Sequence, residues 1–136
     1  PQEVYDNPAN LFVAKFLGTP PINVFSGNVS DGKLYIGKDA VLNTSGIPNM
    51  EVYVGIRPEG FLLSENGSLC CAMGGVEVMG RDISIVSMNE ASLNFSIRSI
   101  ISSDSKVDEN AAFVHFALKP NKVLLFDKKT EKRITF

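Results

Sequence analysis

The strongest candidate for specific chemistry in the sequence is the run Arg57-Pro58-Glu59. It closes Met50–Arg57, an alternating segment rich in Val and Ile that is typical of a strand, and Pro58 removes a backbone donor where that strand should stop. A guanidinium at a strand end can bind a carboxylate or backbone carbonyls through two parallel hydrogen bonds. Two interpretations stay open: a contact across an interface between domains, or an internal salt bridge that fixes the corner.

Asn23 is a weaker candidate, for an anion site. Its polar side chain and the free backbone N–H groups near Thr19-Pro20-Pro21 are the components of a concave nest for an anion. However, the segment Pro21-Ile22-Asn23 supplies no arginine. The sequence therefore favours a structural turn at Asn23.

The sequence contains two adjacent cysteines, Cys70 and Cys71, and a single histidine, His115. Neighbouring cysteines seldom form a relaxed disulfide, and the distant histidine does not complete a set of metal ligands. We interpret the cysteines as reduced, structural thiols. His115 lies within an alternating run and should share a face with Phe113 and Ala117, so we expect a partly covered strand histidine.

No catalytic machinery is evident in the sequence. It has no G-x-x-x-x-G-K-[ST] loop to hold phosphates, no apolar strand that ends in Asp-Glu to hold magnesium, and no nucleophile with a base and an acid at recognisable spacing. We therefore predict that this chain is not an enzyme, hydrolyses no ATP and has no catalytic, cofactor-binding or metal-binding residues.

Composition narrows the class of protein further. The 136 residues are 44% hydrophobic, which is enough for a packed core of one domain or two very small ones. The net charge of −2, with scattered basic residues, gives no electrostatic footprint for nucleic acid. No apolar run approaches the roughly 20 residues that cross a bilayer, so we expect a soluble chain.

These candidate residues must be positioned mainly by strands. One helix is predicted near the start, capped by Asn7, begun by Pro8 and ended by Gly18. An Asp31-Gly32 turn indicates a hairpin directly after Val24–Val29. Further strands are predicted at Leu34–Ile36, Met50–Arg57, Phe61–Leu63, Gly75–Met79, Ile83–Met88, Ser92–Ile101, around Val107, and at Ala111–Leu118, Val123–Phe126 and Ile134–Phe136. Many short strands separated by turns indicate an all-β barrel or sandwich.

Three segments carry a resemblance to a known family. The opening PQEVYDNPANLFVAKFLG, the run Val54–Glu59 (VGIRPE) and the ending Phe126–Ile134 resemble the C-terminal part of ATP-binding subunits of ATP-binding-cassette (ABC) importers, in the branch that serves sugars, glycerol phosphate and related solutes. The opening is interpreted as the turn that leaves an absent ATPase domain. In the last segment Phe126, Asp127, Thr130, Glu131 and Ile134 match the F-D-x-x-T-[GE]-x-x-[IL] pattern of the family.

The resemblance implies a fold and a division of the chain. Residues 1–21 would be a linker and short helix, and residues 22–136 a β-rich regulatory domain of two intertwined barrels of the oligonucleotide/oligosaccharide-binding (OB) type. Residues 75–136 would form its transport-associated OB (TOBE) module. In the family, the corner matching Arg57-Pro58-Glu59 lies close to where two regulatory domains meet.

The resemblance also implies a function. The chain would be the regulatory and dimerisation domain of an importer ATPase subunit, located at the cytoplasmic face of the membrane. ATP and magnesium would bind only the parent protein, whose partners would be a second copy, the permease subunits and a possible cytosolic regulator. The alternatives are a free-standing molybdate or oxyanion-binding barrel, in whose relatives a small residue, Arg and Asn bind the anion, and a single-stranded nucleic-acid-binding OB domain.

Overall fold

The computed structural model describes residues 9, 10 and 21–136, which are nearly all in strands and turns. The elements are β1 (Asn23–Ser30), β2 (Lys33–Ile36), β3 (Asp39–Asn43), β4 (Met50–Ile56), the 3-10 turn η1 (Pro58–Gly60), β5 (Phe61–Leu63), β6 (Leu69–Met79), β7 (Asp82–Met88), β8 (Ile97–Ser102), β9 (Phe113–Leu118), η2 (Pro120–Lys122), β10 (Val123–Asp127) and β11 (Arg133–Ile134). Among these residues no helix is long and apolar enough to span a membrane. The helix predicted around Asn7–Gly18 lies outside the described residues.

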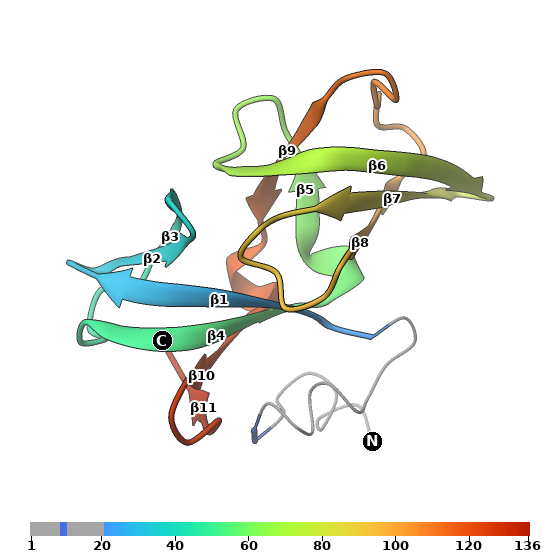
Figure 1. Cartoon of the computed structure of the whole chain (residues 1–136). Helices are drawn as coiled ribbons and strands as arrows, with labels where there is room; N and C mark the ends of the chain where they lie inside the picture. The colour runs from blue at the N-terminus through green and yellow to red at the C-terminus, as the bar shows by residue number, and fades with distance from the viewer. Residues whose placement is uncertain (1–8, 11–20) are drawn as a thin grey trace.

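The strands form two antiparallel sheets (Figure 1). The first has the order β11-β10-β4-β1-β2-β3, and the second the order β5-β9-β6-β7-β8. The edges β5 and β8 of the second sheet lie close together without pairing, so this sheet curls into a nearly closed barrel. The predicted all-β fold of the OB type is confirmed.

The chain passes between the sheets at two neighbouring points. It leaves the first sheet after β4 through η1, builds the whole second sheet, and returns through η2 into β10. Because β10 pairs with β4, Ile56 and Val123 face each other where the chain leaves and where it returns. The segment after β7 adds a further link, since Ser26 and Leu93 donate backbone hydrogen bonds to Ala91 and Val24.

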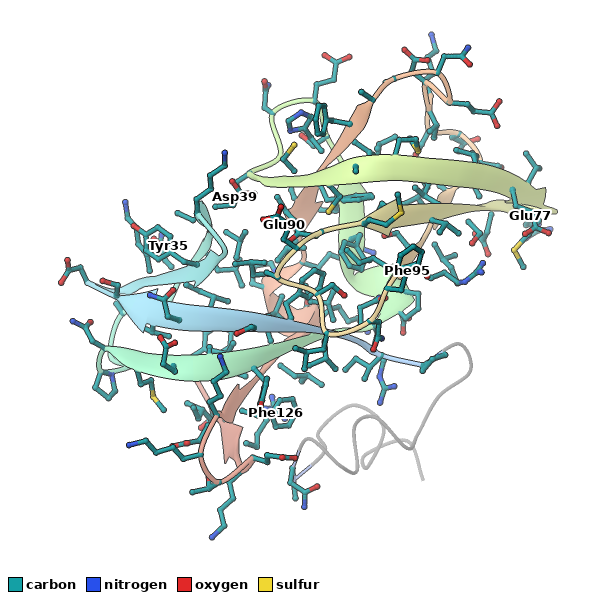
Figure 2. All side chains as sticks on the ribbon, in the orientation of Figure 1. Tyr35, Asp39, Glu77, Glu90, Phe95 and Phe126 are labelled. Carbon is teal, nitrogen blue, oxygen red and sulfur yellow. The ribbon has the colours of Figure 1, made fainter. Side chains whose placement is uncertain are left out.

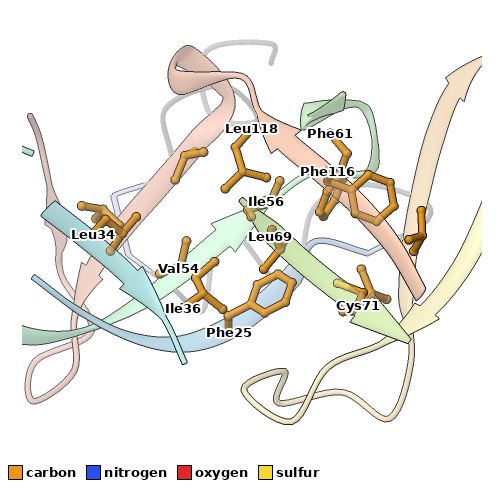
Figure 3. Packing of buried hydrophobic residues seen from close by; sticks show 14 of the residues in the cluster. Phe25, Leu34, Ile36, Val54, Ile56, Phe61, Leu69, Cys71, Phe116 and Leu118 are labelled. Atoms are coloured by element: carbon orange, nitrogen blue, oxygen red, sulfur yellow. The ribbon is translucent and has the colours of Figure 1, made fainter. Parts of the chain in front are cut away.

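One hydrophobic core is shared by both sheets (Figure 3). Phe25 and Val54 from the first sheet and Leu69 from the second are fully buried in it. The rings of Phe61 and Phe116 pack edge to face, with centroids 5.1 Å apart, an arrangement that aromatic quadrupoles favour. A smaller cluster of Ile22, Val24, Leu124 and Phe126 is also buried.

Several predicted strands are confirmed and others are corrected. Asp31 and Gly32 adopt φ values of 51° and 78°, as a tight hairpin turn requires, and the turn joins β1 to β2. The strand predicted around Val107 is wrong, because residues 103–112 form turns, bends and irregular structure. The backbone N–H of Asn110 donates to the side chain of Asp108 there. The strand predicted at Ser92–Ile101 begins only at Ile97, since Ser92 makes a single bridge to Phe25 before the chain bends.

Candidate functional site

Asn23 joins the two sheets through its side chain. It is 3% exposed, and its Nδ2 donates to the carbonyl oxygens of Ile56 (3.0 Å) and Arg98 (2.9 Å). Its Oδ1 accepts the backbone N–H of Arg98 at 3.0 Å. Ile56 ends β4 in the first sheet and Arg98 lies in β8 of the second. Since both amide hydrogens are engaged, this environment favours the structural interpretation of Asn23 over the anion site.

The run Arg57-Pro58-Glu59 forms the corner directly after Ile56. Arg57 is 3% exposed and Pro58 is buried, whereas Glu59 is half-buried. The backbone N–H of Gly60 donates to the carbonyl of Arg57 at 2.8 Å and closes the turn. A Cβ atom at Gly60 would lie 2.9 Å from Cγ2 of Ile56, so only glycine fits this corner without rearrangement. The burial of Arg57 favours an internal role for its guanidinium.

The second crossing is bound to this corner. Lys119, which directly precedes η2, donates its backbone N–H to the carbonyl of Gly60 at 3.0 Å and its Nζ to the carbonyl of Glu59 at 2.8 Å. We call Asn23, Ile56–Gly60, Arg98 and Lys119–Lys122 the sheet junction. The structure thus brings both candidates from the sequence into one place, where hydrogen bonds connect the two sheets.

The cysteines and the histidine lie in the second sheet. Cys71 faces the core, and burial raises the pKa of its thiol to about 11, so the thiol stays protonated well above neutral pH. Cys70 is half-buried and pairs across the ladder with His115 on β9. Both cysteines are free thiols, and His115 is partly covered, as predicted. Within the described ranges no three Cys, His, Asp or Glu side chains gather into a possible metal site.

Sequence reasoning missed a cleft of about 530 Å³ between the β2–β3 turn and the second sheet. Asp39, Glu90 and Phe113 are among the residues that line it. These residues are far apart in the sequence and belong to no recognisable motif. The sequence indicated only that Phe113 shares a face of its strand with the partly covered His115.

Comparison with known proteins points to one class. No protein-family model matches the chain. The diacetylchitobiose uptake system ATP-binding protein of Streptomyces coelicolor is 30% identical over 99% of the chain and 42% of its own length. The oligosaccharides import ATP-binding protein of Bacillus subtilis is 32% identical over 98% of the chain and 40% of its own length. The sn-glycerol-3-phosphate import ATP-binding protein of a Jannaschia species is 29% identical, over 98% and 38%.

The chain thus spans about two-fifths of the length of these three relatives, all of which are named as ATP-binding proteins of uptake or import systems. The similarity covers almost all of the chain and one part of each relative. The similarity therefore supports the assignment of this chain as a domain of an importer ATP-binding subunit.

Proposed function

We propose that the chain is the regulatory and dimerisation domain of the ATP-binding subunit of an ABC importer for a sugar, polyol, polyamine or related solute. The observation that carries the proposal is the alignment of nearly the whole chain with part of several importer ATP-binding proteins. The lack of a phosphate loop in the sequence supports assignment to a part outside the ATPase domain.

In this proposal the parent subunit binds ATP and magnesium, pairs with a second copy and contacts permease subunits at the cytoplasmic face of the membrane. The domain contributes a contact that persists while the ATPase domains are apart. Their reclosure over ATP is then intramolecular and occurs at high effective concentration. A regulator that binds the domain shifts the balance of open and closed states by its differential affinity for them.

The proposed division keeps residues 1–21 as the linker and residues 22–136 as the β-rich domain, with residues 75–136 as the transport-associated module. Position 75 falls within β6, and β10 and β11 of the module join the first sheet. This exchange of strands supports the intertwined arrangement. The hydrogen bonds of the sheet junction also suit the role, because they hold together a domain that would itself hold two subunits together.

The decisive experiment uses the full-length parent subunit. We expect it to sediment as a dimer without ATP, and a version that lacks residues 22–136 to sediment as a monomer. A truncated subunit that remains dimeric without ATP would exclude a dimerisation role for this domain.

The proposed interface role of Arg57-Pro58-Glu59 is tested separately. Arg57→Glu is unsuitable because it places a carboxylate at a site that is 3% exposed and so threatens the fold. Glu59 is half-buried and Glu65 is exposed, so Glu59→Arg and its matched control Glu65→Arg make the same charge change. Repulsion across a two-fold contact acts twice, and we expect only Glu59→Arg to weaken association. Equal effects of the two variants would remove this corner from the interface.

A further inference from the structure

The cleft beside the β2–β3 turn has the features of a ligand site. Its volume of about 530 Å³ lies within the range of roughly 300–1,000 Å³ that is typical of small-molecule pockets. Lys38 lines it from the β2–β3 turn and Asp39 from the start of β3. From the second sheet and the loop after β7 the lining residues include Ala72, Met88, Glu90 and Phe113. Figure 2 labels Asp39 and Glu90, which both line this cleft.

Three side chains on one face of the second sheet form the floor of the cleft. Ala72 on β6 pairs with Phe113 on β9 and with Met88 on β7, so the three side chains form a row on one face of the sheet. The buried Cys71 and Val114 point to the opposite face, into the core. Because Ala72 is small, the row is a shallow apolar trough. The ring of Phe113 stands at one side and is 59% exposed.

Both walls are fixed to the same backbone residue. Oδ2 of Asp39 accepts the backbone N–H of Cys70 at 3.1 Å. Nδ2 of Asn89 donates to the carbonyl of Cys70 at 3.0 Å, while its Oδ1 accepts the N–H of Ala91 at 2.8 Å and so holds the loop that carries Glu90. The Asp39 carboxylate and the backbone that carries Glu90 are therefore placed before any ligand arrives, which lowers the entropic cost of binding.

The charged side chains that line the cleft limit the class of ligand that it can bind. One lysine and two carboxylates line the cleft, so an anion would be repelled. The described residues also provide no group of three ligating side chains for a metal ion. A neutral polyhydroxy compound fits both the carboxylates and the apolar floor of the cleft. Its hydroxyls can donate to the carboxylates, and its C–H faces can pack on the exposed ring of Phe113.

The cleft continues into a second space, so a ligand longer than one sugar ring can fit. A second space of about 340 Å³ shares Gly37, Glu90 and Ala91 with the cleft. It continues over β1 and β4, where Ser26 and Glu51 line it. We propose that this cleft binds a neutral oligosaccharide, with one ring on Phe113 and its hydroxyls on Asp39 and Glu90. Binding itself goes beyond the proposed function and needs no ATPase domain, whereas any regulatory consequence rests on it.

The test is a titration of the 136-residue chain, followed by ¹H–¹⁵N NMR. The probes are maltotriose, cellobiose and N,N′-diacetylchitobiose, with spermidine as a cationic probe and glucose 6-phosphate as an anionic one. We expect saturable shifts with at least one neutral oligosaccharide, centred on the amides of Cys70, Ala72 and Phe113. Because the sequence has no tryptophan, Phe113→Trp adds a single fluorescent reporter that keeps an aromatic ring on the floor of the cleft.

Matched variants locate the site. Phe113→Ala should weaken binding about 3- to 10-fold through loss of the ring contact, whereas Phe95→Ala should change it less than 2-fold. Phe95 is the control because it is 93% exposed and does not line the cleft. Asp39→Asn should also weaken binding, because it removes the charged acceptor but can still accept the N–H of Cys70.

Three results would overturn the inference: no saturable shift with any of the oligosaccharides, saturation only with spermidine or glucose 6-phosphate, or equal losses in Phe113→Ala and Phe95→Ala. The sedimentation experiment on the parent subunit is independent of all three. A failed titration therefore leaves the proposed function standing, and a monomeric parent would leave the oligosaccharide site standing.

Discussion

Replacing Asn23 should show how strongly one side chain holds the two sheets together. Asn23→Ala removes one buried and two partly buried hydrogen bonds of 2.9–3.0 Å. It leaves the carbonyls of Ile56 and Arg98 and the N–H of Arg98 without this partner. At about 1 kcal/mol net for each bond, the free energy of unfolding should fall by about 3 kcal/mol. For a chain of this size that corresponds to roughly 9–15 °C in melting temperature.

Urea and thermal unfolding of the 136-residue chain measure this loss. Asn28→Ala is the matched control, because Asn28 lies on the same strand and is half-buried, and it should cost less than about 0.5 kcal/mol. Asn23→Asp keeps the side-chain volume but turns a carboxylate oxygen toward two carbonyls, so we expect at least as large a loss as for Asn23→Ala. A loss below about 1 kcal/mol in Asn23→Ala, or equal losses in Asn23→Ala and Asn28→Ala, would refute this account of the sheet junction.

Three further outcomes are expected. Gly67→Ala should destabilise the chain strongly, because a Cβ there would lie 2.3 Å from the backbone of Phe116, whereas Gly75→Ala, with nothing within 4 Å, should be near neutral in thermal unfolding. Burial raises the pKa of Cys71 from 9.0 to about 11, so between these pH values the unfolded chain loses the proton first and stability falls, by about 2–3 kcal/mol in all. Urea unfolding between pH 9 and 11 should show that the free energy of unfolding falls more steeply with pH in wild type than in Cys71→Ala. The same pH dependence in both proteins would contradict this expectation. Calorimetric titration with magnesium-ATP should show no binding to this chain, and micromolar affinity would place a nucleotide site within it.

The local parts of the fold were predictable from the sequence. Asp31-Gly32 fixes a hairpin because few other residue pairs adopt positive φ values at both positions. Alternation placed His115 on the partly covered face of β9 and Val114 in the core. β3 was missed, since Asp39–Asn43 has no buried residue and its pairing with β2 contains an irregularity between Leu34 and Tyr35. The strand predicted around Val107 does not form, because a lone β-branched residue among turn-forming residues does not make a strand.

The candidate site was less predictable, because its contacts join residues that are distant in the sequence. The sequence singled out Asn23 and Arg57 by type but contained no sign that Asn23 bonds to Arg98, 75 positions away. The burial of Arg57 depends on the elements packed around η1, which no local pattern reveals. The cleft could not be predicted from the sequence for the same reason, because its two walls come from different sheets.

The pairing of Ile56 with Val123 has a consequence for how the chain can change over evolution. The whole second sheet is inserted in the sequence between β4 and β10, two strands that pair directly with each other in the first sheet. Changes in loop length within residues 61–118 therefore leave the spacing and register of β4 and β10 untouched. The first sheet can therefore keep a fixed shape while the loops of the second sheet change in length.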